Sequence, residues 1–405
     1  MSFSFPRALI KRIDIAMNDT PVVFINGPRQ SGKTTLVQHY TKSLPYYTLD
    51  DDNLLNAVLQ DPVGFIKRID RGIIDEIQRA PGLFRAIKLS VDENRQPGRF
   101  LITGSVDLLA LPKMGDSLAG RMEVLTLLPL SLAELEGRDS QFLDHAQAQD
   151  WPISIENKID CVMKALIGGY PEMLSRENLS RRSAWARAYI KAIVERDVKD
   201  ITSIEKLVDL PPLLEILAQH SGKLVNFTQI GAYLNLDVKT TQKYIGLLEN
   251  LFLVKQLRPW HGNALSRLIK TPKLHLLDSG LLACLNRITP ARIETDKIIT
   301  GALLETWVYG ELLKMIAITP DPRNIYYYRD KDQVEVDFVL ENQDRKLIGI
   351  EVKAGATIFN HDFTGLRKLA SLVGDDWISG IVLYDGDQCL SFGNNLWAIP
   401  LSLLV

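Results

Sequence analysis

Residues 27–35 have the types and spacing of a phosphate-binding loop. The run F-I-N-G-P-R-Q-S-G-K-T-T-L matches G-x-x-x-x-G-K-[ST]. The two glycines let the backbone curl so that its N–H groups point at phosphate oxygens. Lys33 would reach the β- and γ-phosphates, and the Thr34 hydroxyl would ligate Mg²⁺. The predicted nucleotide-binding residues are Gly27, Pro28, Arg29, Gln30, Ser31, Gly32, Lys33, Thr34 and Thr35.

A strand before this loop and a helix after it must hold it in place. Residues 22–25 are all apolar, as in a buried strand, and a helical pattern begins at residues 36–37. The alternative is a glycine-rich turn before an ordinary helix. The strand-loop-helix context favours the phosphate-binding loop.

Two adjacent acids end a second apolar segment, G-I-I-D-E-I-Q, at residues 72–78. Here Asp75 would hold magnesium through water, and Glu76 would polarise the attacking water. A strand end at the surface is the alternative, because the apolar run is short. The position about forty residues after the loop favours the catalytic interpretation.

Two further side chains are predicted near the terminal phosphate. Ser105 ends a predicted strand at residues 99–105, where its hydroxyl would contact the γ-phosphate or the water beside it. Arg121, in the segment S-L-A-G-R, is a candidate arginine finger in its own subunit or in a neighbour's site. For Ser105 the alternative is a plain turn.

The segments GPRQSGKTT, IIDEIQ, FLITGS and SLAGR together resemble the AAA-type ATPase module of a large prokaryotic family of uncharacterised ATPases. GGYPE (168–172) and YIKAIVERDV (189–198) resemble that family's second half, so the resemblance covers most of the chain. It is a resemblance to an AAA_14-like ATPase fused to a DUF4143-like region. It implies ATP and Mg²⁺ as cofactors and Arg196 as a second candidate finger, with a surface salt bridge as the alternative for Arg196.

The middle of the chain has the order helix, turn, helix, strand. Helices are predicted at 213–219, 228–234 and 238–250, with Asp237 as an N-cap, and a strand at 252–257. This order is typical of a winged helix-turn-helix, whose third helix lies in a major groove. Packing against another domain or subunit is the alternative. The residues predicted to contact DNA are Lys239, Thr240, Gln242 and Lys243.

Acids lie among apolar residues near the C-terminus. Glu305 belongs to a predicted helix at 302–316, Asp337 to a strand at 334–340, and Glu351 to a strand at 347–352 with Lys353 just beyond it. This arrangement resembles the PD-(D/E)xK nuclease superfamily. The resemblance implies a divalent ion, Mg²⁺ or Mn²⁺, at Asp337 and Glu351, and a lysine that orients the attacking water. Such folds also occur as inactive DNA-binding domains.

Composition fits a globular protein of several domains. The chain has 405 residues, of which 46% are hydrophobic and 24% charged, and its net charge is −2. Contact with nucleic acid would therefore depend on local basic patches. Three scattered cysteines favour a reducing cytoplasm over a disulfide framework or a structural zinc site. We expect neither a signal peptide nor a membrane span.

The predicted fold class is α/β. We expect an AAA-type P-loop core at 1–138, a helical lid at 139–206, a winged helix-turn-helix at 207–262 and a PD-(D/E)xK nuclease-like domain at 263–405. The leading hypothesis is an ATPase acting on DNA as a homo-oligomer, either a ring or a dimer. One alternative is a nucleotide-controlled regulatory or scaffold protein that binds DNA, branched DNA included, or a partner protein without cleavage. Another makes the C-terminal fold a protein-docking module in a defence or toxin-type system.

Overall fold

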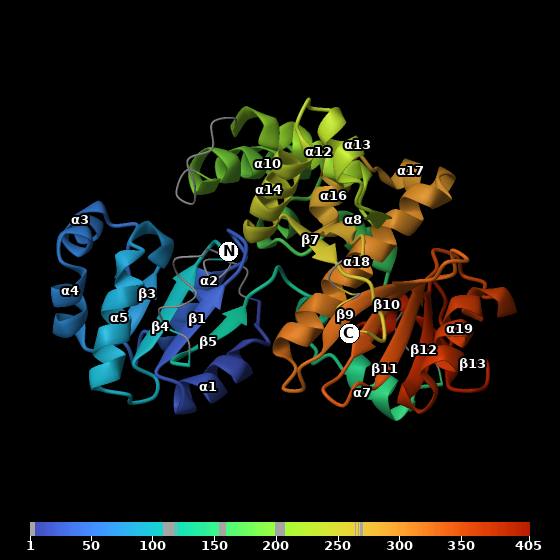
Figure 1. Ribbon diagram of the computed structural model, residues 1–405, viewed down its shortest axis with the longest axis horizontal. Coiled ribbons are helices and arrows are strands. Elements are labelled where there is room, and N and C mark those ends of the chain that lie inside the picture. Colours follow the sequence, from blue (N-terminus) through green and yellow to red (C-terminus); the bar gives the residue numbers. More distant parts are fainter. Residues whose placement is uncertain are drawn as a thin grey trace.

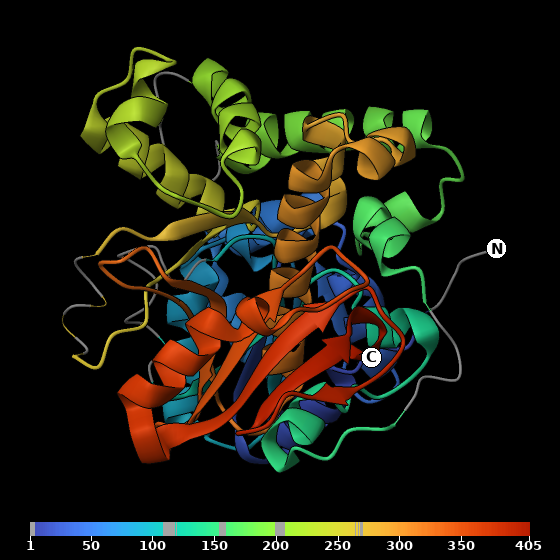
Figure 2. The same cartoon turned by 90° about the vertical axis from the view of Figure 1, so that its right-hand side faces the viewer.

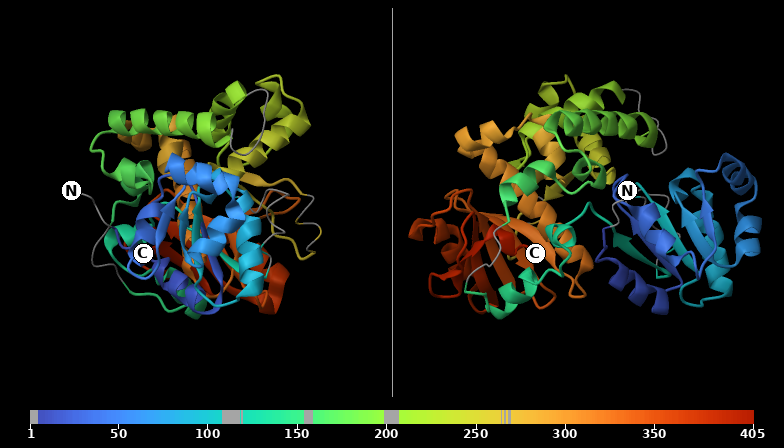
Figure 3. Two further views of the ribbon diagram at one scale, coloured as in Figure 1. Left: turned by 90° about the vertical axis from the view of Figure 1, so that its left-hand side faces the viewer. Right: turned by 180° about the vertical axis from the view of Figure 1, so that it is seen from behind.

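The computed structural model describes residues 5–107, 118, 120–153, 159–198, 207–263, 265, 267 and 270–405. The N-terminal and C-terminal α/β domains lie side by side, and a helical layer covers both (Figure 1). The view from behind shows the same arrangement (Figure 3). The expectation of a mixed α/β fold with a parallel sheet is confirmed.

The N-terminal domain contains a parallel five-stranded sheet with the order β2-β3-β4-β1-β5. Strands β1, β3 and β4 are buried throughout, as expected for a parallel sheet with helices on both faces. The strands are β1 (Val22–Asn26), β2 (Tyr46–Thr48), β3 (Gly72–Asp75), β4 (Phe100–Gly104) and β5 (Met122–Thr126). The helices are α1 (Ile10–Asp19), α2 (Lys33–Val37), α3 (Asp52–Gln60), α4 (Pro62–Ile69) and α5 (Gly82–Glu93), with 3-10 turns η1 (Gln38–Tyr40) and η2 (Ile77–Arg79).

This topology gathers the predicted catalytic segments. The loop of residues 27–32 follows β1, Glu76 follows β3, and Ser105 follows β4. Because the carboxyl ends of parallel strands meet at one edge of a sheet, segments about seventy residues apart in the chain become neighbours.

The helical layer ends in a small antiparallel sheet with the order β6-β8-β7. Its helices are α6 (Leu132–Glu136), α8 (Cys161–Ile167), α9 (Pro171–Leu174), α10 (Leu179–Ala192), which continues as a π-helical turn (Ile193–Asp197), α12 (Leu210–Gln219), α13 (Phe227–Ala232), α14 (Val238–Asn250), α16 (Ser279–Leu285) and α17 (Pro290–Thr295). Helix α7 (Phe142–Ala148) instead packs against the sheet of the C-terminal domain (Figure 1). Its strands are β6 (Lys223–Leu224), β7 (Val254–Leu257) and β8 (Lys273–Leu276).

The pairing of β7 with β8 crosses the boundary predicted at residue 262. Val254 lies opposite Leu276, and Leu257 lies opposite Lys273. The first part of the segment assigned to the last domain therefore belongs to the sheet of the helical layer. The sequence did not signal this, because fifteen residues separate the two strands.

The C-terminal domain is a mixed six-stranded sheet with the order β13-β14-β12-β11-β10-β9. The long helix α18 (Lys297–Ile318) runs behind this sheet and reaches up into the helical layer (Figure 2). Helix α19 (Thr364–Val373) packs against β10, β11 and β12. The strands are β9 (Asn324–Arg329), β10 (Glu335–Glu341), β11 (Leu347–Val352), β12 (Trp377–Tyr384), β13 (Leu390–Ser391) and β14 (Leu396–Pro400), and 3-10 turns lie at Asn360–Phe363, Gly374–Asp376 and Leu401–Leu403. Across the described ranges, every helix is too short or too polar to cross a membrane.

Candidate functional site

The loop after β1 has a backbone that its glycines make possible. Gly27 has φ 145° and Gly32 has φ 97°, both in the region that glycine tolerates best. A Cβ atom at Gly27 would lie 2.2 Å from the carbonyl oxygen of Leu127. The close approach of β5 therefore requires glycine at this position.

Lys33 lies at the start of α2 with its ammonium group directed back into the loop. Its Nζ donates to the carbonyl oxygens of Gly27 at 2.9 Å and Pro28 at 2.8 Å, and the residue is buried. These neutral acceptors hold the ammonium beneath the loop, where a bound triphosphate would lie.

Asp75 at the end of β3 collects three hydroxyl groups. Its Oδ2 accepts from Thr34 Oγ1 at 2.9 Å and from the Tyr46 hydroxyl at 2.7 Å, and its Oδ1 accepts from Thr103 Oγ1. Burial and the hydrogen bond to Asp75 raise the pKa of Tyr46, so its hydroxyl remains a donor at neutral pH. Thr34 and Asp75 offer adjacent hard oxygen ligands, and this donor pair fits Mg²⁺.

Glu76 has a left-handed backbone, with φ 62°. Its carboxylate accepts from the side-chain amide of Gln78, and the same Nε2 donates to Ser105 Oγ at 2.9 Å. Ser105, predicted to contact a phosphate, is thus joined to Glu76 through Gln78. Glu76 lines the same cavity as Glu195, from the π-helical turn that continues α10.

A cavity of about 1140 Å³ lies over the loop. Among the predicted residues that the structure describes, Gly27, Pro28, Asp75, Ser105 and Arg121 lie outside its lining. Arg121 pairs instead with Asp92 on α5, and the Arg196 side chain lies outside the described residues. The predicted residues that line the cavity are Arg29, Gln30, Ser31, Gly32, Lys33, Thr34, Thr35 and Glu76.

Two side chains that the sequence analysis missed hold this loop from outside. Arg7 donates to the carbonyl oxygens of Ser31 at 2.7 Å and Leu128 at 2.6 Å, and it pairs with Glu134 at 3.0 Å. Tyr189 of α10 donates to the carbonyl oxygen of Arg29 at 3.0 Å. Arg7 belongs to no motif, and Tyr189 begins the segment YIKAIVERDV, but only the tertiary contacts show that both hold the loop.

Helix α14 has the two faces that the sequence predicts. Asp237 caps the helix by accepting from the Thr240 amide at 2.9 Å, and Lys239, Gln242 and Lys243 are exposed. The Thr240 hydroxyl also donates to Asp237, at 2.6 Å. Its side chain is thereby held at the cap and is only partly exposed, unlike the other three.

The acids of the C-terminal domain come together as predicted. The register of β10 and β11 places Asp337 beside Glu351, and the Val352 amide donates to Asp337 Oδ2 at 2.9 Å. Lys353 Nζ lies 3.1 Å from Glu351 Oε1. Glu305 approaches from α18 and is joined to Asp337 through one shared cation.

That cation is Lys273, from β8. Its Nζ lies 3.1 Å from Glu305 and 3.7 Å from Asp337, it also contacts Glu335, and the residue is only 2% exposed. We call Lys273, Glu305, Glu335, Asp337, Glu351 and Lys353 the carboxylate cluster.

The cluster does not fit the divalent ion expected at Asp337 and Glu351. Lys273 and Lys353 occupy the carboxylate oxygens that would serve as ligands. Within the described ranges, no group of three or more histidine, cysteine, aspartate or glutamate side chains is arranged to hold a metal. The signal for Lys273 was its alternation with Leu274, His275 and Leu276, which places two polar side chains on one buried strand face.

Burial dominates the electrostatics of the cluster. Burial raises the pKa of Glu305 and of Glu351, and the nearby Asp337 adds to the rise. Lys273 and Lys353 oppose it, and the resulting pKa of each glutamate is about 8. For Lys273, burial lowers the pKa, but the attraction of Glu305, Asp337 and Glu335 outweighs it and the pKa rises. Lys273 therefore remains charged at any physiological pH.

Family comparisons match three consecutive parts of the chain. A model described as an AAA domain matches residues 19–136, and one described as a domain of unknown function (DUF4143) matches residues 300–404. The chain is an AAA-type ATPase domain fused to a DUF4143 region. Between the AAA domain and the DUF4143 region, a further domain of unknown function (DUF8612) matches residues 160–292, a range that includes both β7 and β8.

Two uncharacterized proteins align with most of the chain. The uncharacterized protein Rv2008c of Mycobacterium tuberculosis is 29% identical over 394 residues, covering 96% of this chain and 82% of that protein. The uncharacterized protein MJ1544 of Methanocaldococcus jannaschii is 21% identical over 370 residues, covering 85% and 77%.

Among solved structures, AMPPCP-bound DnaA from Aquifex aeolicus has a TM-score of 0.28 at 15% identity, covering 60% of this chain and 86% of that one. A STAND protein from Pyrococcus horikoshii has a TM-score of 0.27 at 12% identity, covering 76% of this chain and 50% of that one. Scores this low do not establish a common arrangement of the whole molecules.

Proposed function

We propose that this protein binds and hydrolyses ATP and uses the nucleotide to control its contact with DNA. The observation that supports this most directly is the cavity over the loop after β1, lined by Lys33 and Thr34. Mg²⁺ bound between the Thr34 hydroxyl and Asp75 would neutralise phosphate charge. Lys33 would contact the β- and γ-phosphates, and Glu76 would accept a proton from the attacking water.

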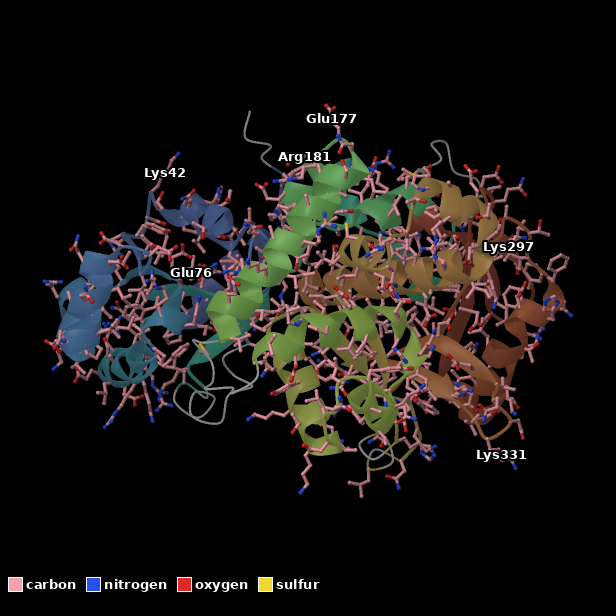
Figure 4. All side chains as sticks on the ribbon, turned by 90° about the horizontal axis from the view of Figure 1, so that it is seen from above. Lys42, Glu76, Glu177, Arg181, Lys297 and Lys331 are labelled. Carbon is pink, nitrogen blue, oxygen red and sulfur yellow. The ribbon has the colours of Figure 1, made fainter. Side chains whose placement is uncertain are left out.

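The direct test is ATP turnover by purified protein, with and without DNA. We expect Lys33→Ala to lower turnover by about 100-fold or more, because it removes a charge directed at the transferred phosphate. Lys42→Ala is the matched control, since Lys42 is an exposed lysine of the same domain (Figure 4). Equal turnover by wild type and Lys33→Ala would exclude this site as the ATPase centre.

For DNA we propose a winged helix-turn-helix formed by α12, α13, α14 and the β7–β8 pair. The exposed face of α14 offers Lys239, Gln242 and Lys243 to phosphates and base edges. We expect wild type to bind a fluorescent DNA duplex and the double variant Lys239→Glu/Lys243→Glu to lose this binding. Packing of this face against a partner protein is the alternative, and duplex binding unchanged by the double variant would favour it.

We further propose an oligomer, either a ring or a dimer, in which Arg121 acts on a neighbour's nucleotide. The pairing of Arg121 with Asp92 on the surface of its own domain is compatible with such a role. The proposed units are an ATPase core to residue 138, a lid to 206, the winged helix and a PD-(D/E)xK nuclease-like domain, with β8 assigned to the winged helix. The three unpaired cysteines, Cys161, Cys284 and Cys389, agree with a cytoplasmic location.

For the carboxylate cluster we favour a regulatory role without cleavage. Lys273 supplies inside the cluster the positive charge that a nuclease would take from a metal. Metal-dependent cleavage is the second candidate, because Glu305, Asp337, Glu351 and Lys353 still gather as a nuclease-like site requires. Plasmid and branched DNA incubated with Mg²⁺ or Mn²⁺ distinguishes the two. Products that disappear in Glu351→Ala would establish cleavage and reverse our preference.

A further inference from the structure

Two adjoining cavities of about 830 and 640 Å³ lie where the helical layer meets the edge of the C-terminal sheet. They share Arg267, Lys270, Asn324 and Tyr326, so they form one continuous depression. We call it the cationic groove. Neither the nucleotide cavity nor the carboxylate cluster contributes to it, as far as the described residues show.

The groove is built by contacts between the helical layer and the C-terminal domain. After β7 the chain runs alongside β9, where Pro259 forms a bridge with Tyr327. The Tyr327 amide donates to the carbonyl oxygen of Arg258 at 3.0 Å, and the Trp260 amide donates back to that of Tyr327. Figure 2 shows this segment beside the edge of the C-terminal sheet. The groove is therefore part of the folded architecture.

Aromatic rings line the groove beside a partly buried arginine, Arg267. The Arg267 guanidinium pairs with Glu341 and lies 4.8 Å from the ring centre of Tyr326 and 5.5 Å from that of Trp260. Tyr328 also touches the lining, but Tyr328 and Trp260 are buried at 7% and 9% exposure, so Tyr326 is the accessible ring. Flat aromatic and guanidinium surfaces are the groups on which unpaired bases stack.

The charge of the lining is positive once ion pairs are subtracted. Each acid of the lining has a cationic partner: Glu249 pairs with Lys255, Asp330 with Lys368, Glu341 with Arg267 and Asp376 with Lys346. Four exposed cations of the lining have no ion pair among the described residues, and these are Arg258, Lys270, Lys331 and Arg345. The groove thus presents uncompensated positive charge beside stacking surfaces.

We propose that the cationic groove binds a single strand of nucleic acid, with phosphates along the four exposed cations and a base against the Tyr326 ring and the Arg267 guanidinium beside it. A duplex hides the faces of its bases, so the Tyr326 ring favours a single strand. An acidic peptide would use the cations but not the ring. The groove also includes Gln242 of α14, so the inference rests on the proposed DNA contact of that helix and extends it.

The test is fluorescence anisotropy with labelled oligo-dT at several salt concentrations. With four phosphate contacts, the logarithm of the association constant should fall with the logarithm of the salt concentration with a slope of about −3. With two contacts the slope should be about −1.4. We expect Lys331→Glu/Arg345→Glu to weaken binding at least about tenfold and to reduce the slope accordingly. The control is Lys297→Glu, a reversal at an exposed lysine on α18 away from the groove (Figure 4). Unchanged affinity in the double variant would overturn the proposal.

Two further arms separate the neighbouring explanations. Tyr326→Ala should weaken oligo-dT binding with an unchanged salt slope, because it removes stacking and no charge. If this variant binds like wild type, and poly-glutamate displaces oligo-dT, the groove is a site for acidic protein and the assignment fails. Duplex binding by Lys239→Glu/Lys243→Glu reports on α14 alone. Loss of one activity without the other therefore shows which of the two proposals is wrong.

Discussion

Two lysines with almost the same exposure, 4% for Lys33 and 2% for Lys273, serve opposite arrangements. The ammonium of Lys33 is held by neutral carbonyl oxygens at the edge of a cavity of about 1140 Å³. The ammonium of Lys273 is surrounded by carboxylates. The first lysine borders space for a ligand, whereas the second lies among carboxylates that neutralise its charge.

Helix α18 joins these two regions physically. Glu305 belongs to the carboxylate cluster, and Glu311 on the same helix accepts from the Leu132 amide at 2.8 Å. Leu132 begins α6, whose Glu134 pairs with Arg7, and Arg7 contacts the loop after β1. Glu305 and Glu311 lie about 9 Å apart along the helix axis, so α18 contacts the carboxylate cluster directly and the loop after β1 through α6 and Arg7.

The largest expected effect comes from removing Lys273, the buried cation of the carboxylate cluster. Lys273→Met leaves buried carboxylates without their partner, and we expect a loss of about 3–5 kcal/mol in unfolding free energy. Chemical denaturation at pH 7.5 measures it. Lys346→Met is the matched control, because the pair of Lys346 with Asp376 is exposed and should contribute less than about 1 kcal/mol.

The same variant also sharpens the question of metal binding. If Lys273 stands where a divalent ion would otherwise be needed, Mn²⁺ should raise the melting temperature of Lys273→Met and leave wild type unchanged. An equal rise in both proteins would mean that the cluster accepts metal despite its lysine. If Lys273→Met melts at the same temperature as wild type, Lys273 does not stabilise the carboxylate cluster, and the contrast between Lys273 and Lys33 fails.

At the cavity over the loop after β1, Glu76→Gln should separate ATP binding from ATP hydrolysis. The amide cannot accept the proton of the attacking water, so turnover should fall by about 100-fold or more. Binding of a fluorescent ATP analogue should persist, because the phosphate contacts of Lys33 and Thr34 do not involve Glu76. Turnover close to that of wild type would show that another group acts as the base.

A further expected effect is a pH dependence of stability. The pKa of Glu305 is raised in the folded state from 4.5 to about 8, so the folded protein binds more protons than the unfolded chain between these values. Stability should therefore fall as the pH rises from about 5 to about 8. Thermal unfolding at several pH values should show a weaker dependence in Glu305→Gln than in wild type. Glu294→Gln, at an exposed position, should match wild type.

The sequence predicted well wherever a local pattern carries the chemistry. Gly27, Gly32, Lys33 and Thr34 lie within one short segment, so their spacing alone predicts a phosphate-binding loop. Helix α14 occupies the predicted residues, because its N-cap and its apolar periodicity are both local signals. The strand positions of Asp337 and Glu351 likewise follow from alternation, which also places them as neighbours.

The sequence by itself determined the loop, the helix faces and the acids of the last sheet, because each depends on residues only a few positions apart. Only the tertiary structure decided what neutralises those acids. Lys273 is 32 residues from Glu305 and 64 from Asp337 in the chain, on a strand of a different sheet. Compensation of buried charge depends on distance in space, and the pairing of β7 with β8 sets that distance. The tertiary structure alone also decided the contacts of Arg7 with the loop after β1. It likewise decided the cationic groove, whose sides come from the helical layer and the C-terminal domain.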